Sequence, residues 1–330
     1  MQFDQLKRRE VITLIGGAAA WPLVAQAQQT SRAARIGFLG VNMPSGVEPR
    51  LRRFRAGLRD LGYVEGQNIF IDFRWAEGNY SRLVEFADEL LHLKADILVT
   101  YGTPGTLAAR QATTTTPIVM IVSGDAVATG IVASLARPGG NVTGSTFFNP
   151  ELSAKRLEVV KEAHPPARRV AILLNAGNPI NAPVMRATEI AAKPLGLELL
   201  SFETRRSDEL QSTFSRISDA GIDAVGVTDD TLFVGDARVI AELAISNRLP
   251  SIGFTELAPA GGLIGYGANI GDLWYRGAFF IDRILKGTRP ADLPVEQPTK
   301  FEMAINLKTA KALGLQVPPT LLARADELIE

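Results

Sequence analysis

Short apolar runs of strand length alternate with amphipathic runs of helix length along the chain, and this alternation constrains the fold more than any other feature. It predicts a parallel β-sheet covered by helices on both faces. We expect strands at residues 35–40, 69–75, 96–100, 117–122, 141–146, 169–175, 197–204, 223–228, 250–254, 263–268 and 301–306. We expect helices near 51–61, 80–92, 105–112, 126–136, 151–163, 180–193, 208–219, 233–247, 272–287, 308–313 and 319–328.

The alternation begins again after Pro150, so the chain contains the same architecture twice. Residues 60–103 align with 194–231, each with a Leu-Gly pair, a strand, a polar turn, a helix and a second strand. About 300 residues also exceed what one core usually spans. The predicted fold class is α/β, with two doubly wound parallel-sheet lobes joined by three crossover segments near 147–150, 269–272 and 288–298. The N-terminal lobe would comprise 32–146 plus 271–290, and the C-terminal lobe 147–270 plus 296–330.

The first 27 residues have the three parts of a secretory signal peptide. Basic residues Lys7, Arg8 and Arg9 precede an apolar run, and small residues stand at Ala25 and Ala27. The run is too short for a membrane span, so we expect cleavage after Ala27 and a periplasmic protein. The Arg8-Arg9 pair resembles a twin-arginine signal but lacks several of its usual neighbours, which leaves the Sec and twin-arginine routes both open.

The composition of the chain argues against several classes of function. The 35 basic and 35 acidic residues balance, which argues against binding to nucleic acid or anionic membranes. The chain has no cysteine, which removes disulfides, thiolate metal sites and thiol nucleophiles. The two histidines, His92 and His164, lie away from the predicted strand ends. We therefore expect a protein that is not an enzyme and holds no metal or cofactor, although a racemase or isomerase using carboxylates stays open. We also expect the protein to be a monomer.

Ligands of open parallel sheets bind outside the carboxyl ends of the strands, so the loops at those ends are the candidate site. In the 101–106 loop, "YGTPGT", two glycines allow close approach of a ligand, Thr103 and Thr106 offer hydroxyls, and a helix N-terminus suits a carboxylate. A capped helix start explains the same residues. Asp125, Asp229 and Asp230 are acceptors for an ammonium group or helix N-caps.

Amides and aromatic side chains at the same predicted edges complete the set. Asn175 and Asn178 either bind a polar ligand or stabilise turns, and Trp75, Tyr101, Phe147, Tyr266 and Trp274 pack on a ligand or in the core. The predicted ligand-binding residues are Asn42, Tyr101, Thr103, Gly105, Thr106, Asp125, Asn175, Asn178, Asp230 and Tyr266.

Two long stretches, "VSGDAVATGIVASLARPGGNVTGST" and "TKFEMAINLKTAKALGLQVPPTLLARADELIE", together with the N-terminal segment, resemble ABC-transporter substrate-binding proteins of the tryptophan/tyrosine type. The resemblance covers essentially the whole chain. It implies a type I periplasmic-binding fold that closes over a small solute, an amino acid or small carboxylate with or without an aromatic ring. It also implies delivery to an ABC permease and its ATPase. By position, Thr103 and Thr106 match the family's carboxylate-side loop, and Asp125, Asn175 and Asp230 fall on cleft loops. A ligand sensor for a receptor kinase is the alternative role.

Overall fold

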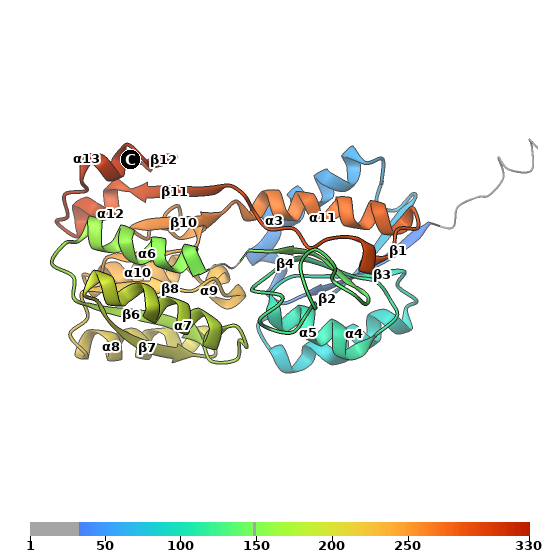
Figure 1. The fold of residues 1–330 in the computed structure, drawn as a ribbon, viewed down its shortest axis with the longest axis horizontal. Coiled ribbons are helices and arrows are strands. Elements are labelled where there is room, and N and C mark those ends of the chain that lie inside the picture. The colour runs from blue at the N-terminus through green and yellow to red at the C-terminus, as the bar shows by residue number, and fades with distance from the viewer. Residues whose placement is uncertain (1–32, 148–149) are drawn as a thin grey trace, which may run out of the picture. The chain divides into compact units, whose positions relative to one another are not determined.

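The computed structural model describes residues 33–147 and 150–330, and it contains two β-sheets (Figure 1). The first has the strand order β2-β1-β3-β4-β5 and is parallel throughout. Its strands are β1 Ala34–Gly40, β2 Ile69–Trp75, β3 Ile97–Thr100, β4 Ile118–Ser123 and β5 Val142–Thr146. The second has the order β12-β11-β10-β9-β8-β6-β7. Its strands are β6 Arg169–Asn175, β7 Glu198–Thr204, β8 Ala224–Val227, β9 Ser251–Gly253, β10 Ile264–Ala268, β11 Phe301–Asn306 and β12 Glu327–Ile329.

Each sheet with its helices forms a lobe, which confirms the predicted α/β class. The first lobe carries α3 Pro44–Asp60, α4 Leu83–His92, α5 Thr103–Ala112 and α11 Ile270–Leu285. The second carries α6 Pro150–Ala163, α7 Asn181–Ala192, α8 Leu210–Asp219, α9 Thr231–Gly235, α10 Ala237–Ser246, α12 Leu307–Ala312 and α13 Pro319–Leu322. Short 3-10 turns occur at η1 Tyr80–Arg82, η2 Lys193–Leu195, η3 Ser207–Glu209, η4 Thr255–Leu257 and η5 Pro290–Asp292.

Helix α11 belongs to the first lobe although it lies in sequence between β10 and β11 of the second. It packs beside α3 and against β4, as Figure 1 shows. Gly57 makes this approach possible, because a Cβ atom there would lie 2.4 Å from the carbonyl oxygen of Tyr275. The helix therefore closes the core of the first lobe, where the buried Trp274 ring packs on Phe38 and Tyr101.

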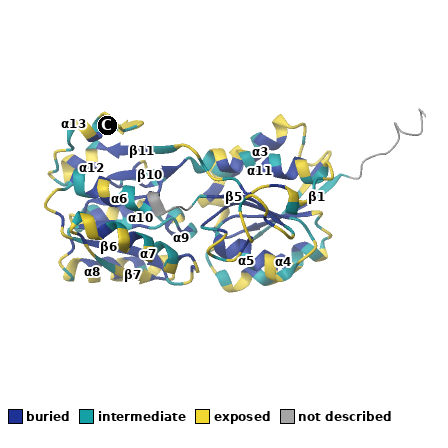
Figure 2. Ribbon diagram, viewed as in Figure 1, coloured by how far each residue is buried: buried dark blue, intermediate teal, exposed yellow. Residues whose placement is uncertain are grey.

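The cores lie where the sequence pattern places apolar residues. Figure 2 shows buried residues on the strands and on the inward sides of the helices. In β6, Val170 and Ile172 belong to the cluster on one face of the second sheet, whereas Ala171 and Leu173 belong to the cluster on the other. Because both faces of such a strand are buried, its sequence is a continuous apolar run, which is typical of parallel sheets covered by helices.

Three expectations about local structure are wrong. Residues 126–136 form turns in place of a helix, because the Asp125 carboxylate accepts hydrogen bonds from the N–H groups of Val127 and Ala128, and Gly130 adopts a positive φ of 68°. The expected last helix ends at Leu322, and residues 327–329 form β12 beside β11. Strand β11 is antiparallel to β10, so the second sheet is mixed.

The last crossing between the lobes, expected at 288–298, is still bonded to the first sheet over much of that range. The Thr143 hydroxyl donates to the carbonyl of Leu293 at 2.8 Å, and the N–H of Glu296 donates to the carbonyl of Gly144 at 2.9 Å. The chain therefore passes to the second sheet between Glu296 and Phe301. The predicted leader and its cleavage point, and residues 148–149 of the first crossing, lie outside the described residues. In the described part of the chain, no helix has both the length and the apolarity needed to cross a bilayer.

Candidate functional site

Both sheets have a point where the strand order reverses, and the predicted residues other than Asp125 and Tyr266 lie at the ends of the strands on either side of it. In the first sheet this point lies between β1 and β3, and in the second between β6 and β8. Ligands of doubly wound sheets bind in the crevice outside such points. Asn42 and the 101–106 loop follow β1 and β3. Asn175 is the last residue of β6, and Asn178 and Asp230 follow β6 and β8.

Residues from both lobes line one cavity of about 50 Å³, called here the shared cavity. Four predicted residues, Tyr101, Thr103, Asn178 and Asp230, are among its lining residues. An adjoining cavity of about 50 Å³, called here the apolar cavity, lies mainly within the second lobe. The two cavities have in common Gly124, Phe147, Asn178, Ile180 and Asp229. The apolar cavity is otherwise lined mostly by aliphatic side chains, among them Leu152, Leu157, Ile172, Val184 and Ile252.

Asp230 is the centre of a hydrogen-bond network that joins the lobes. Its Oδ1 accepts from Asn175 Nδ2 at 2.9 Å and from the N–H of Leu232 at 2.8 Å, and its Oδ2 accepts from Asn178 Nδ2 at 2.7 Å. It is also the N-cap of α9. Burial raises the pKa of Asp230, and these hydrogen bonds oppose the rise. Both asparagine side chains are therefore held by the Asp230 carboxylate.

Tyr80 completes this network from the first lobe. Its hydroxyl donates to Asp230 Oδ1 at 3.1 Å, accepts from Asn175 Nδ2 at 3.0 Å and lies 2.9 Å from Thr231 Oγ1. Burial, with the nearby Asp230 charge, raises the pKa of Tyr80. Tyr80 is absent from the predicted ligand-binding residues, although it follows β2 and its loop lies at the same edge of the sheet as the loops after β1 and β3.

Tyr101 and Asn42 hold the loop after β1. The Tyr101 hydroxyl accepts from the N–H groups of Val41 at 3.1 Å and Asn42 at 3.0 Å, and burial raises the pKa of Tyr101 to about 12. The side-chain amide of Asn42 donates across the lobes to the carbonyl of Thr231. These contacts give Tyr101 a fixed ring beside the shared cavity.

Helix α5 begins at the shared cavity after Gly102, and no side chain caps its first N–H groups. Gly102 adopts a positive φ of 74°, and the N–H of Gly124 donates to Thr103 Oγ1 at 3.2 Å. The Thr106 hydroxyl donates to the Gly102 carbonyl at 3.0 Å. A Cβ atom on Gly105 would lie 2.4 Å from Thr100 Oγ1. Gly105 and Thr106 therefore support the loop from within and do not line either cavity.

Asp125 and Tyr266 lie outside the lining of both cavities. Asp125 stabilises the turn described above. The Tyr266 ring stacks on Phe301 with centroids 6.3 Å apart, and its carbonyl oxygen accepts two hydrogen bonds from Arg156, at 2.8 Å from Nε and 2.7 Å from Nη2. Tyr266 thus contacts Arg156, a lining residue of the apolar cavity, through its backbone carbonyl and not through its ring.

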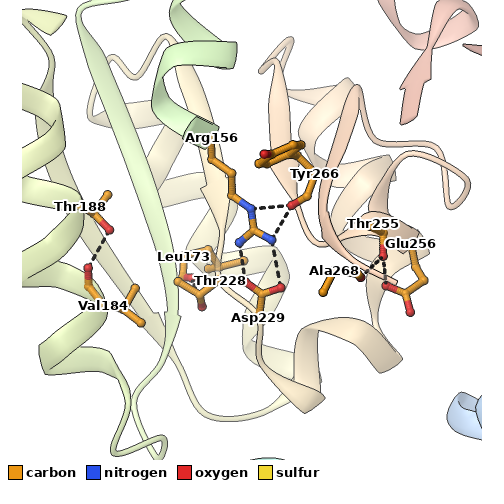
Figure 3. A network of polar contacts seen from close by, with 10 residues as sticks. All are labelled: Arg156, Leu173, Val184, Thr188, Thr228, Asp229, Thr255, Glu256, Tyr266 and Ala268. Carbon is orange, nitrogen blue, oxygen red and sulfur yellow. Dashed lines mark hydrogen bonds and ion pairs between the residues drawn. The ribbon is translucent and has the colours of Figure 1, made fainter. Parts of the chain in front are cut away.

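Arg156 is the residue that sequence reasoning had no signal to find, because it lies on α6 and not on a loop at a strand end. Figure 3 shows its guanidinium group between the carbonyl of Tyr266 and the carboxylate of Asp229. It pairs with both oxygens of Asp229, with Nη2 at 3.0 Å from Oδ1. The Arg156 side chain is 12% exposed and that of Asp229 is 18% exposed.

A different ion pair, at the border of the shared cavity, links the two lobes. Arg50 of α3 donates through Nε to Oε1 of Glu256 in η4 at 3.1 Å. Burial alone would raise the pKa of Glu256, but the charge and hydrogen bonds of Arg50 outweigh it and hold the pKa below its usual value. The described residues contain no group of three or more histidine, aspartate or glutamate side chains placed to bind a metal ion.

Two doubly wound lobes with a cavity at their reversal points define a protein of the type I periplasmic-binding architecture. Residues 45–329 match the family described as "ABC transporter substrate binding protein". The chain belongs to this family.

Individual relatives agree with this assignment. The chain is 31% identical to a tyrosine-binding protein of Clostridioides difficile over 265 residues, which is 80% of this chain and 76% of the relative. A Streptococcus pneumoniae ABC domain in complex with L-Trp superposes with a TM-score of 0.83 at 26% identity, covering 90% of this chain and 99% of that one. A ligand-free, open substrate-binding protein from Clostridium difficile gives 0.64 at 25% identity, with the same coverage.

Proposed function

We propose that this protein is the periplasmic substrate-binding component of an ABC importer. It captures a small solute, an amino acid or small carboxylate, in the cleft between its lobes and delivers it to a membrane permease. The observation that carries the proposal is the shared cavity, whose lining comes from both lobes at both strand-order reversals. A site built in two halves binds its ligand fully only when the lobes close, which couples ligand capture to a hinge movement.

The direct contacts between the lobes support the interpretation that this is a closed form. Tyr80 with Asp230, Asn42 with Thr231, and Arg50 with Glu256 all join first-lobe to second-lobe residues. The higher TM-score with the L-Trp complex than with the ligand-free, open relative points the same way. The permease would recognise this closed form and accept the solute from it.

The start of α5 supports a carboxylate group on the solute. Gly102 and Thr103 line the shared cavity, and the first turn of a helix presents N–H groups and a partial positive charge that favour an anion. The Thr103 hydroxyl adds a further polar group. An amino acid offers such a carboxylate, as does a small organic acid, so both classes belong in the first ligand screen.

Calorimetry on the purified mature chain with the common amino acids and a set of small organic acids tests the proposal. We expect at least one compound to bind with a one-to-one ratio and to raise the unfolding temperature. Ligand at 100 times its Kd stabilises the folded state by about 2.7 kcal/mol. Chemical turnover of a bound compound would contradict the proposal and favour an enzyme. Fractionation of cells expressing the full chain tests the periplasmic location.

A further inference from the structure

A further cavity, of about 300 Å³, lies beside the second crossing between the lobes, and it is called here the hinge cavity. Its lining includes Asn269 and Gly271, where the chain passes from β10 of the second lobe to α11 of the first. Side chains of α3 line it from the first lobe, and residues of η4, β11 and β12 line it from the second. The two walls therefore belong to different lobes, and their separation changes when the lobes move.

The two walls of the hinge cavity carry opposite charges. On the first-lobe wall, the charged lining residues are Arg50 and Arg53 of α3. On the second-lobe wall, the charged lining residues are all acidic: Glu256, Glu302, Asp326 and Glu327. Two neighbouring groups reduce these charges without reversing the sign of either wall. Asp272 pairs with Arg53 at 2.6 Å, and Lys300 pairs with Glu302 at 3.0 Å.

The pair of Arg50 with Glu256 shows that the walls meet in the closed form. It joins Nε to Oε1 at 3.1 Å across the lobes. The acidic residues nearer the C-terminus are placed differently. Asp326 accepts from the N–H of Met303 in its own lobe at 2.8 Å. Glu327 is exposed, and no described residue forms an ion pair or a side-chain hydrogen bond with it. Its attraction to the arginines therefore acts through solvent.

Charges of this kind respond to the separation of the lobes and to salt. Their Coulomb energy falls as the walls move apart, so the attraction favours the form in which Arg50 reaches Glu256. The Arg53 side chain is 52% exposed, and attraction between exposed charges is weak and is screened by ions. The screening length is about 30 Å at 0.01 M salt and about 3 Å at 1 M. The effect should therefore be present at low ionic strength and absent at high ionic strength.

We propose that attraction between the walls of the hinge cavity maintains a closed population of the free protein at low ionic strength, and that salt lowers this population. The apparent affinity for a solute should fall with it, because a ligand of the closed form binds more weakly when less of that form is present. This inference rests on the proposed hinge closure and is independent of the class of solute.

Energy transfer between two fluorophores measures the closing without any ligand. The chain has no cysteine, so Glu85→Cys on α4 and Gln211→Cys on α8, both at exposed positions, attach one label to each lobe. We expect energy transfer in the free mature chain to fall between about 0.01 M and 1 M NaCl. Transfer that does not change with salt, or the lack of a closed population at 0.01 M, would overturn the inference. A rise in transfer when a solute is added would support solute binding in either case.

Graded changes at Glu327 separate the effect of charge from an effect on packing, because this exposed side chain has no partner to lose. In the labelled chain at about 0.01 M NaCl, Glu327→Gln should lower the ratio of closed to open protein about 1.5- to fivefold, the range for one exposed charge pair. Glu327→Lys reverses the charge and should lower the ratio further, by roughly the square of that factor. Both differences should vanish at about 1 M NaCl.

Glu189→Gln and Glu189→Lys are the matched controls. Glu189 is an exposed glutamate on α7 of the same lobe, and it lines none of the cavities described above. Both control variants should leave the ratio of closed to open protein unchanged at every salt concentration. Equal effects of the two series, or an effect of Glu327→Lys that persists at about 1 M NaCl, would overturn the inference.

Discussion

Removing the Tyr80 hydroxyl should weaken ligand binding without any change in the residues that line the cavities. Tyr80 belongs to the first lobe, and its hydroxyl bonds Asp230 at 3.1 Å and Asn175 at 3.0 Å in the second. Under the proposed hinge closure, these bonds form only in the closed form. In an open form the same groups would be hydrated, so Tyr80→Phe destabilises the closed form selectively.

The size of the effect follows from the chemistry of the acceptor. A hydrogen bond to a charged group contributes about 1.5–3 kcal/mol, and the lower end applies because Asp230 keeps three other donors when the Tyr80 hydroxyl is removed. When a ligand binds the closed form alone, a shift of the closing equilibrium appears in full as a change in the apparent Kd. About 1.5 kcal/mol therefore corresponds to a Kd roughly 10-fold higher.

Calorimetry with the tightest ligand from the screen measures this change, and small-angle scattering of the free and saturated protein measures the closing itself. Tyr275→Phe is a matched control, because the Tyr275 hydroxyl donates to Asp60 at 2.7 Å within the first lobe. It should leave the Kd unchanged. A Kd for Tyr80→Phe within about twofold of the wild type, together with a free protein that scatters as an open form, would refute the reasoning.

The pH dependence of the ion pair between the lobes gives a second prediction. The pKa of Glu256 is held below its usual 4.5, so the stabilisation that Glu256 contributes is complete above about pH 4.5 and is lost as pH falls through the lower folded-state pKa. Between pH 6 and pH 3, the Glu256→Gln variant should therefore lose less stability, measured by thermal unfolding, than the wild type or the exposed control Glu242→Gln. Parallel curves of unfolding temperature against pH would contradict this. Gly105→Ala should lower the free energy of unfolding by about 1–3 kcal/mol through overpacking, whereas Gly46→Ala, also in the first turn of a helix and with 3.7 Å of clearance, should not; equal unfolding midpoints in denaturant would be the opposing result. Gly124→Ala places a Cβ 2.8 Å from a second-lobe side chain, so calorimetry should show weaker binding, and an unchanged Kd would show that the lobes accommodate the methyl group.

The strand ends of the first and second sheets illustrate what could be predicted for the site. Tyr101, Thr103, Asn178 and Asp230 follow strands that the apolar runs identify, and strands on either side of an order reversal place their loops together. These four residues line one cavity. The same logic applied to the loop after β2 would have included Tyr80.

Other features of the site had no signal in the sequence. Arg156 lies on an amphipathic helix among other charged residues, and nothing in that pattern distinguishes it from a solvated side chain. Asp229 and Asp230 are adjacent and chemically identical, yet one is bonded to four donors and the other to a single arginine. The sequence does not separate them, because their partners come from residues far along the chain.

The sequence by itself predicted most of the elements of this protein, though not the turns at 126–136 or the strand at 327–329, and it predicted the edge of each sheet where the shared cavity lies. Hydrophobic periodicity is a local property, since each strand or helix shows in its own residues which face is buried. The tertiary structure alone decided which polar groups meet. Asp230 lies 150 residues from Tyr80, and Asp229 lies 73 from Arg156. Hydrogen bonds and ion pairs depend on distances below about 4 Å and on direction, and only the folded chain sets these.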